Sequence, residues 1–168
     1  MRLEDIAPAE KWEALERELH ETTGLNACVY NADGRRITGY TDFANRLCPH
    51  IKSFQAGIDT VCAVANQHCA TVVRESGTPY TAECDAGLAK FVVPIIWDKT
   101  FLGTVGGCGY RFPESEVETF LLHKTLGTPE EELEAMAAEI GTITQAEIDN
   151  SIAFLEKRLT VLFNQAHS

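Results

Sequence analysis

The sequence lacks the features that mark a membrane-spanning or secreted protein. Its longest apolar runs fall short of the roughly 18 consecutive residues that a membrane helix needs. The N-terminus, Met1-Arg2-Leu3-Glu4-Asp5, does not have the charged-then-apolar pattern of a signal peptide. We therefore expect a cytoplasmic protein that makes no membrane contact.

Positive charge is scarce. The chain has 14 Lys and Arg against 25 Asp and Glu, for a net charge of -11. Phosphate contacts need clusters of Lys and Arg, so nucleic acid is not expected as a direct partner. Residues 113–168 hold eleven acidic and only three basic residues. This C-terminal section is expected to present a solvated outer surface.

Motifs of common enzyme classes are also absent. There is no phosphate-binding loop, no Gly-x-Gly-x-x-Gly after a predicted strand, and no Gly-x-Ser-x-Gly elbow. No carboxylate pair stands out as an acid and a base. A cysteine nucleophile would be best placed at Cys84, but it would need a base and a lowered pKa, and no histidine lies near it in the sequence. We expect a protein that is not an enzyme.

Length and composition favour one domain. At 168 residues and 45% hydrophobic content, the chain is long enough to bury a sizeable core. Apolar periodicity and turn signals predict a helix over 8–22, strands over 25–30 and 36–40, a helix from Asp59 or Thr60 to Ser76, and a strand over 79–83. Asp33-Gly34 is the expected turn between the first two strands, because it tolerates positive φ angles.

The stretch from 83 to 108 is expected to form the central hairpin of the sheet. Two apolar runs flank Asp98-Lys99, and Pro94 inside the first run predicts a bulge or an unpaired neighbour. Helices are predicted over 114–126, 128–140 and 145–165. The expected fold is α+β: a mostly antiparallel five-stranded sheet with flanking helices. Residues 1–168 form one domain, with a core over 8–112 and C-terminal helices over 114–166.

The last predicted helix has apolar residues at alternating spacings of four and three. They are Ile148, Ile152, Leu155, Leu159 and Leu162. This heptad pattern has two interpretations. The helix docks on the chain's own sheet, or it forms a seam for a partner helix in a homodimer.

The six cysteines include no Cys-x-x-Cys pair, so the usual zinc-ribbon signature is missing. Cys62 and Cys69, seven residues apart on one helix, would lie about 10 Å apart at a rise of about 1.5 Å per residue. Two thiolates on one zinc lie at most about 4.6 Å apart, so Cys62 and Cys69 are not expected to share one ion. The cysteines at a loop, a helix start and two strand ends are instead placed to converge at one mouth of the sheet: Cys48, Cys62, Cys84 and Cys108. The alternative is that these thiols are small buried hydrophobes.

Several short motifs follow one another between residues 47 and 107, within a resemblance that covers about residues 8–112. They are Leu47-Cys48-Pro49-His50-Ile51, Cys62, Arg74-Glu75-Ser76-Gly77-Thr78-Pro79-Tyr80, Cys84-Asp85-Ala86-Gly87-Leu88, Val93-Pro94-Ile95-Ile96 and Leu102-Gly103-Thr104-Val105-Gly106-Gly107. As an ordered set, they resemble the PocR family of bacterial sensory domains.

The resemblance implies a PAS-like or GAF-like domain that senses small organic molecules, such as simple alcohols or other hydrocarbon derivatives. Such domains usually precede a transcription-regulator, histidine-kinase or cyclic-dinucleotide output. Three cysteine positions of the family carry over, as Cys48, Cys62 and Cys84. Asp85 stands where the family often has histidine, and Cys108 stands where a glutamine usually follows the paired glycines.

Two functional hypotheses follow. In the first, a pocket between the sheet and helix 59–76 binds a small ligand. Its walls would come from Tyr80, Phe91 and Trp97 and its polar anchors from Asp85 and the cysteines, and the last helix would relay the change to a dimer partner. In the second, Cys48, Cys62, Cys84 and Cys108 hold a metal or an iron–sulfur cluster in a redox sensor.

Overall fold

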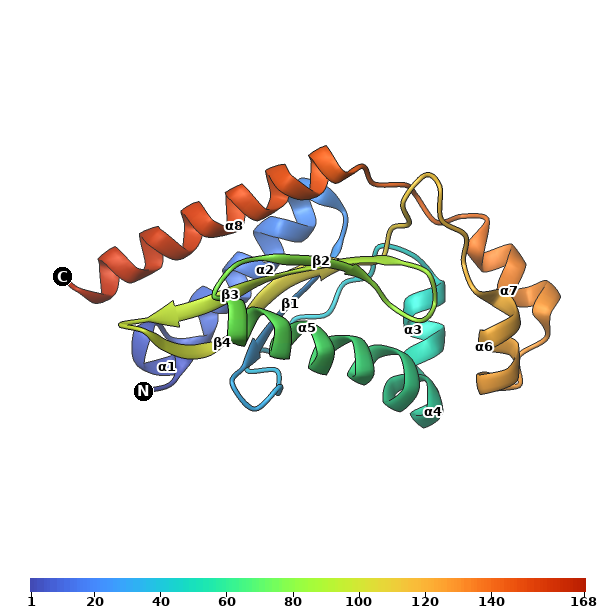
Figure 1. Cartoon of the computed structure of the whole chain (residues 1–168), viewed down its shortest axis with the longest axis horizontal. Helices are drawn as coiled ribbons and strands as arrows, with labels where there is room; N and C mark the ends of the chain where they lie inside the picture. The colour runs from blue at the N-terminus through green and yellow to red at the C-terminus, as the bar shows by residue number, and fades with distance from the viewer.

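The computed structural model describes residues 1–168 as an α+β fold built on one four-stranded antiparallel sheet (Figure 1). The strands are β1 (Asn26–Asn31), β2 (Tyr80–Glu83), β3 (Ala89–Trp97) and β4 (Thr100–Cys108). Their order across the sheet is β1-β4-β3-β2. None of the helices has the length and apolar character needed to cross a bilayer.

The β3–β4 hairpin occupies the centre of the sheet, which confirms the prediction. Its two-residue turn places Asp98 at φ 46° and Lys99 at φ 65°, a left-handed pair that matches the twist of a tight hairpin. β2 pairs with β3 only as far as Val92. The missing backbone N–H of Pro94 therefore leaves no carbonyl of β2 without a donor. A bulge follows directly, between Ile95 and Ile96. The proline therefore lies where the ladder has no bond for it to remove.

Three helices cover one face of the sheet: α1 (Leu3–Ile6), α2 (Ala9–Thr23) and α8 (Gln145–Ala166). The main core lies between them and the strands, with Trp12, Phe91 and Leu155 almost fully buried. The five heptad residues of α8 all belong to this core or pack against it. Their pattern is therefore that of a helix docked on its own sheet.

The opposite face is covered by one continuous helical stretch. It consists of α4 (Gln55–Gly57), a π-helical turn η1 (Ile58–Cys62) and α5 (Ala63–Ser76). Figure 1 shows α5 on the side of the sheet away from α8. The predicted helix end at Gly77, which adopts φ 70°, is confirmed. The predicted start is wrong, because the helical backbone passes through 59 and 60 without a cap.

Three more helices pack together beside the sheet: α3 (Leu47–Lys52), α6 (Thr119–Leu126) and α7 (Glu130–Ala137). The helix predicted over 114–126 begins only at 119. Glu118 donates its backbone N–H to the carbonyl of Ala86 at 2.9 Å, and the backbone of Glu116 lies against Gly87. This segment is therefore tied to the β2–β3 turn, and that docking overrides its helical pattern.

The predicted fifth strand, 36–40, is absent, so the expectation of five strands is wrong. Only a single bridge joins Tyr30 to Arg36. On the outer edge of β1, the Val29 N–H donates instead to the Glu16 carboxylate at 2.8 Å. Because a side chain from α2 satisfies this edge donor, the returning chain makes no ladder with β1 there.

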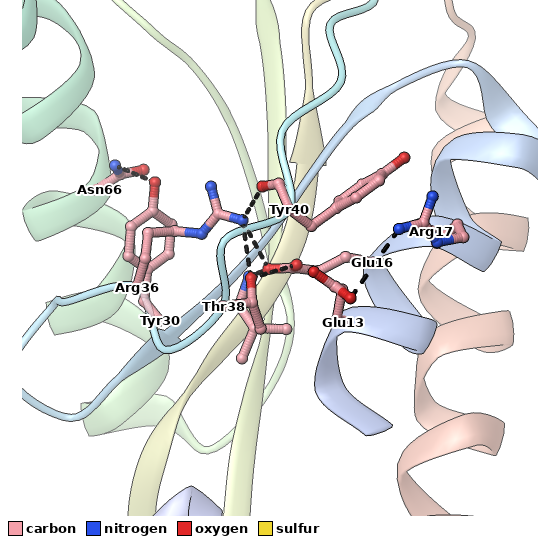
Figure 2. Close-up of polar contacts among 9 residues, drawn as sticks. Glu13, Glu16, Arg17, Tyr30, Arg36, Thr38, Tyr40 and Asn66 are labelled. Atoms are coloured by element: carbon pink, nitrogen blue, oxygen red, sulfur yellow. Dashed lines mark hydrogen bonds and ion pairs between the residues drawn. The ribbon is translucent and has the colours of Figure 1, made fainter. Parts of the chain in front are cut away.

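Glu16 is the centre of a buried polar cluster that replaces the missing strand (Figure 2). Its carboxylate accepts from Arg36 at 2.9 Å and from the Thr38 hydroxyl at 2.5 Å. Arg36 also donates to the Tyr40 carbonyl at 2.7 Å. Burial raises the pKa of Glu16, although its bonds to Thr38, Val29 and Arg36 act in the opposite direction. A buried carboxylate is tolerated only with such partners.

We expect Glu16→Gln to destabilise the fold by about 2–3 kcal/mol. Breaking a fully buried pair costs roughly 3–5 kcal/mol, and the partial exposure of Arg36 (27%) reduces this cost. Urea denaturation measures the difference. Glu13→Gln is the matched control on the same helix, because its pair with Arg17 is exposed and spans 4.0 Å. The control should lose under about 0.5 kcal/mol, and equal losses in both variants would contradict a central role for Glu16.

Candidate functional site

A cavity of about 460 Å³ lies between the sheet and the η1–α5 stretch. β1, β3 and β4 form its floor, and residues 31–34, at the end of β1 and directly after it, line one side. Its volume falls within the range of roughly 300–1,000 Å³ that small-molecule sites occupy. It is therefore the candidate binding site.

Strand alternation decides which residues form the floor. Residues at every second position face the cavity, and their neighbours face the α2–α8 core. The floor residues form three rows across the strands. The first row pairs Tyr30 of β1 with Thr104 of β4. The second consists of Cys28, Gly106 and Val92, and the third pairs Cys108 of β4 with Lys90 of β3.

Gly106 lies in the middle row of this floor. A Cβ atom at this position would lie 2.0 Å from the backbone oxygen of Phe91, a distance that no real contact allows. The close approach of β4 to β3 therefore requires glycine. It also leaves the centre of the floor without a side chain, which keeps the cavity open.

The roof combines small side chains with a polar side chain that bonds to the floor. Ala63 and Ala70 of α5 line the cavity together with Asn66. Asn66 donates its side-chain N–H to the Tyr30 hydroxyl at 3.0 Å, so it ties the roof to the floor (Figure 2). Burial raises the pKa of Tyr30, with Cys28 adding to the effect. The hydroxyl therefore stays protonated and is able to donate to a ligand.

The structure brings two of the sequence-predicted site residues to this cavity, Cys62 from η1 and Cys108 from β4. Tyr80 lies beside it on β2, packed against the cluster of Cys69, Val73 and Val92.

The remaining predicted residues lie elsewhere. Cys48 and Cys84 belong to the α3–α6–α7 core, and Asp85 is exposed in the β2–β3 turn. Phe91 is buried on the opposite face of the sheet. Trp97 packs there against the C-terminal end of α8. The centroid of its ring lies 5.2 Å from that of Phe163 and 4.4 Å from that of His167, the residue directly after the helix.

The cavity residues that the sequence analysis missed include Tyr30, Asn66, Thr104 and Lys90. Lys90 had a recognisable signal. It is the one charged residue in the long apolar run of β3, and a lone charge in a central strand requires an explanation.

Two of the six cysteines, Cys48 and Cys69, are buried, and the other four are half-buried. No group of three or more His, Cys, Asp or Glu side chains comes close enough to hold a metal ion. The cysteine-ligated metal or iron–sulfur centre therefore has no ligand set in this structure. Burial raises the pKa of Cys48 to about 12 and also raises those of Cys28, Cys62 and Cys84. These thiols stay protonated at neutral pH.

Fold and cavity together define an α+β domain with a small-molecule-sized site between one face of its sheet and η1–α5. The chain matches, over residues 5–167, the family model described as a sensory domain found in PocR. It therefore belongs to the PocR sensory-domain family. A comparison with curated proteins found no match.

We expect Gly106→Ala to destabilise the protein by roughly 1–3 kcal/mol, the usual cost of overpacking. The added methyl group would force β3 and β4 apart at the cavity floor. Gly39→Ala is the matched control, since its Cβ would meet no atom within 4 Å, and it should change stability by less than about 0.5 kcal/mol. Thermal denaturation compares the two. A Gly106→Ala variant as stable as the wild type would show that the floor has room for a side chain.

Proposed function

We propose that this domain is a non-enzymatic sensor in bacterial signal transduction that binds a small organic ligand in the cavity between the sheet and η1–α5. The observation that carries the proposal is the cavity itself, about 460 Å³ in volume and located between the sheet and η1–α5. Membership of a sensory-domain family supports the sensing role. The position of α5 across one face of the antiparallel sheet supports the assignment of the fold as PAS-like or GAF-like.

The cavity lining suits a small, partly polar molecule. Tyr30, Asn66 and Thr104 supply hydroxyl and amide groups, while Ile58 and Val92 supply apolar surface. A few polar groups on a largely apolar wall are what orient a ligand in such sites. Simple alcohols and related hydrocarbon derivatives, the ligand class that the PocR resemblance implies, fit this lining.

The relay would pass through β3, because this strand has the cavity on one side and α8 on the other. Val92 faces the cavity, while Phe91 and Val93 belong to the core that α8 covers. If β3 has two placements in the sheet, a ligand that binds more tightly to one of them therefore biases the packing of α8. A cytoplasmic output, such as transcription regulation, would read this change.

Homodimerisation through α8 is part of the proposal, although its heptad residues pack in the chain's own core. A dimer would use the other side of the helix, where Val161 is 40% exposed. We expect Val161→Glu to lower the dimer fraction in sedimentation equilibrium. Gln145→Glu adds the same charge at the far end of the helix and should have no effect. A monomeric wild type would contradict this part.

We expect Ala63→Phe to weaken ligand binding at least tenfold, because the ring would fill the cavity. Val64→Phe is the matched control: the adjacent position is 47% exposed and does not line the cavity. Binding is measured by isothermal titration calorimetry, against a panel of short alcohols, diols, carboxylates and the amides of those carboxylates. Circular dichroism verifies that both variants are folded.

Two results would contradict the proposed site. One is that no member of the panel binds the wild type. The other is that Ala63→Phe, folded like the wild type, binds as tightly as Val64→Phe does.

A further inference from the structure

Lys90 is a largely buried cation that makes no ion pair, and its ammonium nitrogen keeps some accessible surface. It is only 8% exposed and lies on the cavity floor. No carboxylate lies within 4.0 Å of its ammonium group, since the ion pairs of the protein all involve other residues. Its side chain makes no hydrogen bond either. Cys108 lies directly across from it on β4, but the Cys108 sulfur accepts from Asn26 instead. In a folded protein, a buried ammonium group is normally paired.

The groups around Lys90 do not supply the missing negative charge. Burial raises the pKa of the nearby thiols Cys28, Cys62 and Cys69, so they are neutral at physiological pH. Burial opposes the charge on Lys90, and groups that are themselves neutral do not offset this effect. A carboxylate bound beside Lys90 would supply the negative charge that favours its ammonium form.

The rest of the cavity lining is also positive. Lys52 and Arg74 lie on it, and Asp33 is the only acidic residue that does so. Asp33 is exposed, and Arg74 is held at the mouth by its bond to the Ala32 carbonyl at 2.7 Å. This excess of positive charge occurs in a chain whose net charge is -11. A cavity lined in this way attracts anions.

We propose that the ligand of this cavity is a small organic carboxylate whose charged group accepts hydrogen bonds from the ammonium of Lys90. The inference rests on the proposed ligand-binding function of the cavity and names the chemical class of the ligand. The remainder of the molecule lies over Gly106, and its polar substituents face Tyr30 and Asn66 at the other end of the floor.

A carboxylate fits better than a phosphate. Phosphate sites in proteins use several backbone N–H donors at a helix N-terminus or planar Arg forks. Here the first turn of α5 continues from η1, so its N–H groups are already bonded, and Arg74 lies at the mouth. One buried ammonium with a hydroxyl and an amide beyond it matches a singly charged acid.

The test compares acids with their uncharged amides. Acetate, lactate and succinate are titrated by calorimetry against acetamide, lactamide and succinamide, with inorganic phosphate as a further probe. For the wild type we expect at least one carboxylate to bind at least tenfold more tightly than its amide. In Lys90→Met, the affinity for that acid should fall roughly 10- to 100-fold, the usual loss for a charge-assisted hydrogen bond. The affinity for the amide should change less than about threefold.

Lys11→Met is the matched control, because it removes the same charge from an exposed position on α2 away from the cavity. It should leave both affinities unchanged. Without ligand, Lys90→Met should melt at or above the wild-type temperature, because an unpaired buried charge has been removed. Lys90→Gln serves as a second variant if the methionine variant does not fold.

Several outcomes overturn the inference: amides that bind as tightly as acids, no binding by any carboxylate, binding of phosphate alone, or unchanged acid affinity in Lys90→Met. If neutral compounds still bind and Ala63→Phe abolishes their binding, the inference fails while the proposed function stands. If Ala63→Phe leaves all binding intact, the cavity is not the site and both fail.

Discussion

The carboxylate of Glu16 is the interaction on which the arrangement of the domain depends. It satisfies the edge of β1 through Val29 and holds Arg36, so the chain after β1 folds back against α2 rather than adding a strand. The same return places residues 31–34 at the side of the cavity. Arg36 lies 6.0 Å above the ring of Tyr30, whose hydroxyl is bonded to Asn66 of α5. The buried Glu16 carboxylate thus connects α2, on one face of the sheet, with α5 on the other through Arg36 and Tyr30.

The two faces of the sheet have separate roles because β-strands alternate. On β3, Phe91 and Val93 belong to a tightly packed core, and Lys90 and Val92 face a cavity only one residue away. The first face of β3 is closely packed, while Gly106 of the neighbouring strand leaves space on the second face. The relay proposed above would therefore pass through a single central strand to reach α8.

Much of the fold was predictable from local patterns. The central hairpin, the α8 helix and the α+β class follow from periodicity and turn residues, which act over a few positions. The fifth strand was not predictable, because its absence depends on Glu16, 20 residues from Arg36. Of the predicted site residues, Cys62 and Cys108 line the cavity, while Phe91 and Trp97 lie on the far face. Alternation in a sequence shows which residues share a face of the sheet, but not which face lines a cavity and which packs in the core.

The sequence by itself determined the family, the class of fold and the likeness to ligand sensors, since these rest on ordered motifs along the chain. Tertiary structure alone decided where the cysteines lie relative to one another, and they form no metal-ligand cluster. It also decided that the lysine in the middle of an apolar strand is a buried cation on the floor of a cavity. The physical reason is that burial and pairing are properties of side chains brought together from distant segments. A charge in the sequence becomes informative only when its partners, or their absence, are known.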